Sequence, residues 1–130
     1  MSDGGGVTGV IDWANVVIAP PEMDVASAVT NIATLPIKVP GAMRLPLRLL
    51  IASVLRRYVA AYRQLRPLDD ASLRYYQVFR AMVQLRSAAA SLVTGHAGAG
   101  AFHSSTGIQN LISHIHAQGG PKLRLELPQG

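Results

Sequence analysis

Cysteine is absent from this chain of 130 residues, and its absence excludes two kinds of structure. Without thiols the chain forms no disulfide bond and holds no metal ion through thiolates. A chain free of disulfides is compatible with a reducing compartment. From this we expect a cytoplasmic location.

Long hydrophobic runs are also absent. The most apolar stretch, residues 45–55, contains Arg48 and is shorter than the roughly 20 apolar residues that cross a bilayer. Residues 1–4 are acidic and glycine-rich, unlike the basic and apolar start of a secretory signal. We therefore expect no membrane association. Because 49% of the residues are hydrophobic, general disorder is excluded, and the length fits one domain or part of one.

Acidic residues are scarce, with seven Asp and Glu against twelve Lys and Arg, which gives a net charge of +5. The basic residues are spread along the chain and form no block. Dispersed charge indicates solvated helix faces, although contacts with an acidic protein or a nucleic acid remain open. The absence of a compact basic patch disfavours nucleic acid. A third interpretation is that the chain lacks a more acidic portion.

Residues 7–13 (VTGVIDW) form the one stretch that predicts a buried β-strand. Val7, Val10 and Ile11 favour strands, and three glycines precede them. Asp12 stands near the end of this strand, where a carboxylate needs a cation or donated hydrogen bonds. It could bind Mg²⁺, which prefers oxygen ligands, or it could cap the following turn; spacing alone does not decide. Residues 2–6 predict a hairpin turn with no strand before it, so we expect the strand to lack its hairpin partner.

The chain after Pro21 is predicted to be mainly helical, with helices from Pro21 to about residue 34, over residues 47–65, from Asp69 or Asp70 to Val93, and from Ser104 or Ser105 to about residue 118. Residues 35–46, rich in proline, predict a loop, and residues 123–128 predict a terminal strand or extended tail. A short connection predicts that the second and third helices pack antiparallel. The expected inward-facing side chains are Val25, Ala28, Val29 and Ile32, then Leu47, Leu50, Ile51, Val54, Leu55, Tyr58, Val59 and Tyr62, then Leu73, Tyr76, Phe79, Met82, Val83, Ala90 and Val93, and finally Ile108, Leu111, Ile112 and Ile115.

The histidines show no metal-binding pattern. His114 and His116 are two residues apart, which on a helix turns them about 200° from each other. We therefore interpret them as helix-surface residues and not as a chelating pair.

Two short blocks resemble the aminoglycoside phosphotransferase family, a large family of kinase-like enzymes. Residues 9–13 (GVIDW) and 20–26 (PPEMDVA) resemble the family pattern tGviDW followed by gdPxxDlA. The later helices and residues 119–128 (GGPKLRLELP) resemble the end of such proteins. The resemblance implies that the chain is mainly α, as the helical C-lobe portion of a kinase-like α+β fold, with a short N-terminal strand and an extended C-terminal tail.

The resemblance also implies roles for two acids and two cofactors. Asp12 matches the metal-binding acid that follows the catalytic loop, and Mg²⁺ and ATP are the implied cofactors. Asp24 matches a later acid, which would support the active-site loop through hydrogen bonds without taking part in the chemistry. The implied reaction is phosphoryl transfer from ATP to a hydroxyl group of a small molecule.

The departures from the family pattern are equally informative. The family carries an HGDxxxxN loop, with its catalytic base and a metal-binding Asn, shortly before this block, and the 130 residues contain none. The nucleotide loop and the phosphate-binding Lys are also absent. We therefore expect residues 1–130 to be one unit, the C-terminal part of a phosphotransferase, inactive without an N-terminal lobe. Two alternatives remain: a non-enzymatic helical module with an acidic or nucleic-acid partner, and a separate protein that completes a split enzyme.

Overall fold

The computed structural model describes residues 2–3, 6–7, 18–94 and 103–123. Four helices follow a short hairpin in this part of the chain: α1 (Pro21–Ala33), α2 (Gly41–Leu65), α3 (Asp70–Thr94) and α4 (Ser105–Ala117). The prediction of a mainly helical chain is confirmed. No helix among the described residues is long and apolar enough to span a membrane.

The hairpin consists of β1 (Ser2–Asp3) and β2 (Gly6–Val7), which pair antiparallel with Ser2 opposite Val7. The prediction that the strand at Val7 lacks a hairpin partner is therefore wrong. The two residues before the turn are enough to form a short partner strand, because each pair of an antiparallel ladder joins one residue of each strand. The rest of the predicted strand, residues 8–13, lies outside the described residues and stays a prediction.

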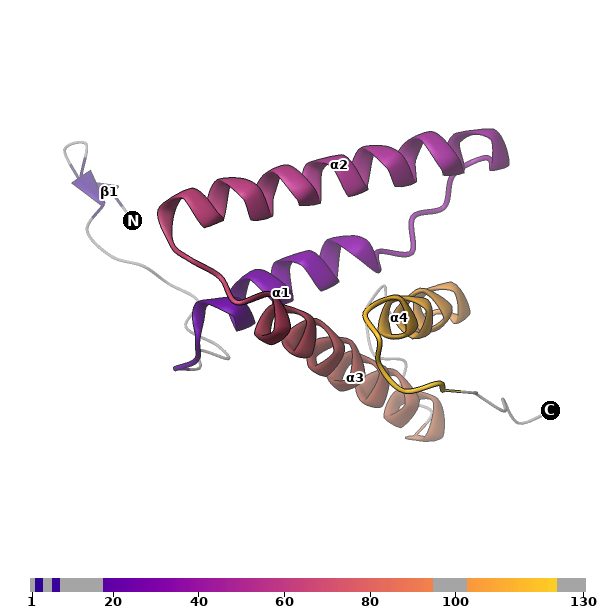
Figure 1. Ribbon diagram of the computed structural model, residues 1–130. Coiled ribbons are helices and arrows are strands. Elements are labelled where there is room, and N and C mark those ends of the chain that lie inside the picture. The colour runs from indigo at the N-terminus through magenta and orange to yellow at the C-terminus, as the bar shows by residue number, and fades with distance from the viewer. Residues whose placement is uncertain (1, 4–5, 8–17, 95–102, 124–130) are drawn as a thin grey trace.

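Helix α1 is the centre of the arrangement, with α2 along one side and α3 and α4 on the other (Figure 1). Its buried residues Val25, Ala26 and Val29 join Leu73 of α3 in one hydrophobic core. The partly buried residues around this core are Leu55, Val59, Tyr62, Leu68 and Tyr76. The prediction that α2 and α3 pack antiparallel is wrong, because both helices pack on α1 and not along each other.

A second core lies between α3 and α4, where Ala81 meets Leu111 and Ile115. The predicted inward face of α3 is therefore wrong in part. Its buried positions are Leu73, Gln77, Ala81 and Ala88, whereas Phe79, Met82, Val83 and Val93 are exposed. Small alanine side chains let α4 approach closely, so the larger apolar side chains of α3 turn away from the contact.

Helix α2 begins at Gly41 and continues through Pro46, so the predicted loop over residues 35–46 is too long. Proline has no N–H to donate to the carbonyl of Ala42, but a helix that starts five residues earlier loses only this one hydrogen bond. None of the side chains of α2 is fully buried. Only part of its predicted wide apolar face is buried against other helices. Leu55 and Val59 pack on the first core, whereas Leu50 is exposed.

Helix α4 begins and ends at the predicted signals. The Ser104 side chain accepts a hydrogen bond from the Gly107 N–H at 3.1 Å, which is an ordinary N-cap. At the other end Gly119 has a φ of 79°, and the Gly120 N–H donates to the Ile115 carbonyl at 2.8 Å. These contacts are those of a Schellman motif, which needs glycine at the left-handed position.

Candidate functional site

Asp24 lies in the first turn of α1, directly after the Pro20–Pro21 start of that helix. The side chain is exposed. A carboxylate in this position is stabilised by the positive end of the helix dipole. Within residues 18–94 and 103–123 no hydrogen bond or ion pair to its carboxylate is found.

Tyr58 of α2 is close enough to Asp24 to feel its charge. Burial raises the pKa of the Tyr58 phenol above its ordinary value, and the negative charge of Asp24 and the neighbouring Tyr62 raise it further. The Tyr58 and Tyr62 ring centroids are 6.4 Å apart. A phenol of α2 therefore lies within electrostatic range of an acid of α1, which the sequence pattern did not predict.

Arginine and tyrosine side chains on the later helices could face a substrate, and the sequence does not choose among Arg44, Tyr58, Arg74 and Tyr75. Of these, Tyr58 is the one whose pKa is raised by the negative charge of Asp24. Arg44 is fourteen residues earlier on the same helix, about 21 Å away along its axis. Tyr75 is on α3, where its ring contacts Tyr76.

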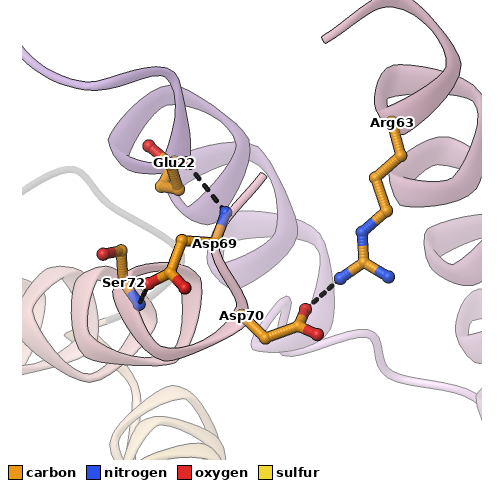
Figure 2. A network of polar contacts seen from close by, with 5 residues as sticks. All are labelled: Glu22, Arg63, Asp69, Asp70 and Ser72. Atoms are coloured by element: carbon orange, nitrogen blue, oxygen red, sulfur yellow. Dashed lines mark hydrogen bonds and ion pairs between the residues drawn. The ribbon is translucent and has the colours of Figure 1, made fainter. Parts of the chain in front are cut away.

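A polar network fixes the end of α1 that carries Asp24 (Figure 2). The buried carboxylate of Glu22 accepts a hydrogen bond from the Asp69 N–H at 3.0 Å. The Asp69 side chain, in turn, accepts from the Ser72 N–H at 2.7 Å and thereby caps α3. Arg63, near the end of α2, forms an ion pair with Asp70. Three helices therefore meet at this network.

The Glu22 contact resembles a capping box divided between two helices. In a capping box the third residue of a helix accepts the N–H of the cap residue, but here that position is Ser72 and the acceptor is Glu22 of α1. The hydrogen bonds from Ser72 hold the pKa of Asp69 below its ordinary value. Because Glu22 is bound to the start of α3, the orientation of the first turn of α1 depends on the α2–α3 connection.

By sequence position Glu22 is an acid in the first turn of a helix, where the helix dipole favours negative charge. A signal for its burial is present in the sequence. Glu22 precedes Val25, Ala26 and Val29 by three, four and seven residues, the spacing of one helix face, and these three residues are buried. A carboxylate on an apolar face requires a hydrogen-bonding partner, although the pattern does not identify that partner.

A second polar group lies between α1, α3 and α4. Thr30 is fully buried; its hydroxyl donates to the Gln77 carbonyl at 3.5 Å and lies 3.5 Å from Nε2 of His114. Burial lowers the pKa of His114 below its ordinary value. His116 faces another partner, since its Nε2 accepts the Leu123 N–H at 3.0 Å. The two histidines therefore make different contacts.

The residues that the structure describes do not form a magnesium site by themselves. No group of three or more His, Asp or Glu side chains among them could hold a metal ion. One oxygen of Glu22 already accepts a backbone N–H. Asp12, the predicted metal ligand, lies outside the described residues, and its role stays a prediction. The role of Asp24 as a supporting acid is likewise untested.

A groove of about 480 Å³ lies between α1 and α2. Its lining combines four apolar residues with two arginines: Val29, Leu55, Arg56, Val59, Ala60 and Arg63. Arg63 is also the partner of Asp70, so one of the two cations is partly neutralised.

These features define a helical unit in which the first turn of α1 carries an exposed acid, Asp24, and is bound through Glu22 to the start of α3. Comparison with known protein families gives a match to the Phosphotransferase enzyme family over residues 1–76. The match covers more than half of the 130 residues, including both acids that carry the sequence resemblance, and the chain belongs to this family of kinase-like phosphotransferases. Neither a curated protein nor a solved structure matches the chain.

Proposed function

We propose that residues 1–130 supply the C-terminal helical unit of a kinase-like enzyme that transfers a phosphoryl group from ATP to a hydroxyl of a small molecule. The observation that carries this proposal is the family match over residues 1–76, which includes Asp12 and Asp24. Phosphoryl transfer depends mainly on positioning and on electrostatic stabilisation of the phosphates, and carboxylates that bind Mg²⁺ are a recurrent part of such sites.

In this proposal Asp12 provides one oxygen ligand for Mg²⁺, and Asp24 supports the segment that carries Asp12. An exposed carboxylate at the start of α1 is suitable for accepting backbone N–H groups of that segment. The Glu22–Asp69 hydrogen bond then holds the start of α1 in place. The helices from α2 onward form a wall of the acceptor site, and Tyr58 of α2 is within electrostatic range of Asp24.

The 130-residue polypeptide is not expected to turn over ATP by itself, since its sequence contains neither an HGDxxxxN loop nor a nucleotide-binding lysine of the family pattern. One carboxylate does not position a nucleotide without these groups. The missing groups would come from a separate or preceding segment. A cytoplasmic location agrees with the use of ATP and stays a prediction.

The test is a reconstitution. The chain is mixed with a polypeptide that carries the nucleotide-binding lobe and the HGDxxxxN loop of a phosphotransferase of the same family, and Mg²⁺-dependent ATP turnover is measured. We expect turnover from the mixture and none from the chain alone. Asp12→Asn should abolish it, and Leu49→Ala, an exposed position on α2, should leave it unchanged.

Two results would contradict the proposal. Turnover by the chain alone that disappears in the Asp12→Asn variant would show that the 130 residues suffice for catalysis. No turnover by the mixture, although the two polypeptides bind each other, would favour a non-enzymatic helical module.

A further inference from the structure

One side of α2 is apolar along its whole length and has no covering element among the described parts of the chain. Successive helix residues are about 100° apart, so residues spaced by three or four share one side. Seven residues with this spacing form what we term the α2 stripe: Met43, Leu47, Leu50, Val54, Tyr58, Ala61 and Leu65. All of them except Leu47 are exposed.

Apart from Tyr58, whose ring lies next to that of Tyr62, the α2 stripe is distinct from the side of α2 that packs on α1. Leu55, Val59 and Tyr62 make the contact with the first core. The stripe is turned away from these three residues by about a quarter of a turn, and at its centre Leu50 is 60% and Val54 49% exposed. Apolar surface that recurs at every turn of a 25-residue helix is typical of an interaction site and not of scattered surface hydrophobics.

The spacing of the stripe favours a helix as the partner. Its steps of three and four residues keep the seven side chains within an arc of about 80°, which is narrower than the apolar side of an ordinary surface helix. A narrow, straight seam matches the seam of a second helix. A membrane surface favours a wider apolar face with a uniformly charged face opposite, whereas the opposite side of α2 carries the exposed Leu45 and Leu49 among its arginines.

The charge of α2 determines which kind of helix fits. Five arginines and no acidic residue occur between Gly41 and Leu65. Arg44 and Arg57 border the stripe on its two sides, and neither is in an ion pair with a described residue. A second copy of α2 would bring like charges together at these borders, which is unfavourable. Acidic residues on both flanks of a partner seam would form ion pairs there instead.

We propose that the α2 stripe binds an amphipathic helix with an apolar seam and acidic flanks. This inference does not rest on phosphoryl transfer, because it uses only the exposed residues and charges of α2. The apolar contacts provide most of the affinity, and the arginines at the borders select the acidic partner and set its dependence on salt.

The test uses the full chain and two synthetic helical peptides with the same leucine seam. One peptide carries Glu on both flanks of the seam and the other carries Lys, and binding is followed by fluorescence anisotropy at low and high salt. We expect the Glu peptide to bind, with an affinity that falls as salt rises, and the Lys peptide not to bind.

Adjacent leucines provide a matched pair of variants. Leu50, in the stripe, is 60% exposed, and Leu49, outside it, is 62% exposed, so neither substitution removes a core contact. Leu50→Ala should weaken binding of the Glu peptide roughly tenfold, whereas Leu49→Ala should leave it unchanged. Arg57→Gln should reduce the salt dependence of binding.

Four results would overturn the inference. Equal effects of the two leucine variants would show that the stripe is not the site. Equal binding of both peptides would remove the role of the arginines. Binding to phosphatidylglycerol vesicles in place of the Glu peptide, lost in Leu50→Ala, would assign the stripe to a membrane surface. A dimer in sedimentation that dissociates in Leu50→Ala would assign it to a second copy of the chain.

Discussion

The hydrogen bond between Glu22 and the Asp69 N–H leads to a prediction about stability. Glu22 is 8% exposed, and its carboxylate accepts the backbone N–H of the residue that caps α3. Replacing Glu22 by Ala removes the acceptor and leaves the side-chain contacts of α2, α3 and α4 in place. The loss should therefore appear as a lower free energy of unfolding and not as a different fold.

The magnitude of the loss follows from two contributions. A hydrogen bond to a charged group contributes about 1.5–3 kcal/mol, and an exposed cap residue lets water replace part of it, which favours the lower end. The negative charge in the first turn of α1 adds about 0.3–1 kcal/mol through the helix dipole. Together Glu22→Ala should cost about 2–3 kcal/mol. For a chain of this size each kcal/mol lowers the melting temperature by about 4 °C, so we expect a decrease of about 10 °C.

Urea and thermal unfolding followed by circular dichroism measure this loss, and Asp24→Ala is the matched control. Asp24 is two residues further along the same turn and is exposed, so its removal should cost only the dipole contribution. Glu22→Gln keeps an acceptor without the charge and should fall between the two. If Glu22→Ala and Asp24→Ala destabilised the chain equally, the buried hydrogen bond would contribute nothing and the reasoning would be refuted.

Three further predictions concern α4 and the site. Gly120→Ala should lower the free energy of unfolding by about 1–3 kcal/mol. The reason is that a Cβ there would lie 2.6 Å from a side chain of α4; Gly41→Ala, with no atom within 4 Å of its Cβ, should not destabilise in the same thermal melt. Because burial lowers the pKa of His114, stability should be full above the ordinary value of 6.5 and should fall as the pH decreases from there towards the lowered pKa. The unfolding midpoint of a His114→Gln variant should depend less on pH than that of the unmodified chain. If both midpoints fell by the same amount from neutral to acidic pH, the prediction would be contradicted. Asp24→Asn should lower the pKa of Tyr58 towards its ordinary value, measured by tyrosinate absorbance, and an unchanged titration would show that the two groups do not interact.

The sequence alone determined the features that depend on neighbouring residues. The ends of α4 follow from Ser104 and from the glycines after residue 118, because capping hydrogen bonds join residues three to five positions apart. The start of α1 at Pro21 and the cap of α3 at Asp69 have the same local origin. The family was also recognised from the sequence, since its two motif blocks lie within residues 9–26 and the match over residues 1–76 confirms it.

The tertiary structure decided which of several apolar faces is buried. Phe79 and Met82 of α3 are as apolar as core residues, yet Ala81 is buried in their place because α4 packs against the side with the small residue. Helix α2 has an apolar surface wider than α1 can cover, so Leu55 is packed and Leu50 is exposed. Periodicity identifies apolar sides of a helix but not the helix that lies against each of them.

At the candidate site, too, the sequence identifies the residue types and the tertiary structure determines their neighbours. The sequence identified Asp12 and Asp24 as acids, because a family pattern depends on residue type and spacing. The interacting residues are 34 to 47 positions apart along the chain: the charge of Asp24 raises the pKa of Tyr58, and the Asp69 N–H donates to Glu22. Such contacts arise only when α1, α2 and the start of α3 pack together. The residue types were thus fixed by the sequence, whereas the neighbours that set the charge and orientation of the site were decided by packing between distant helices.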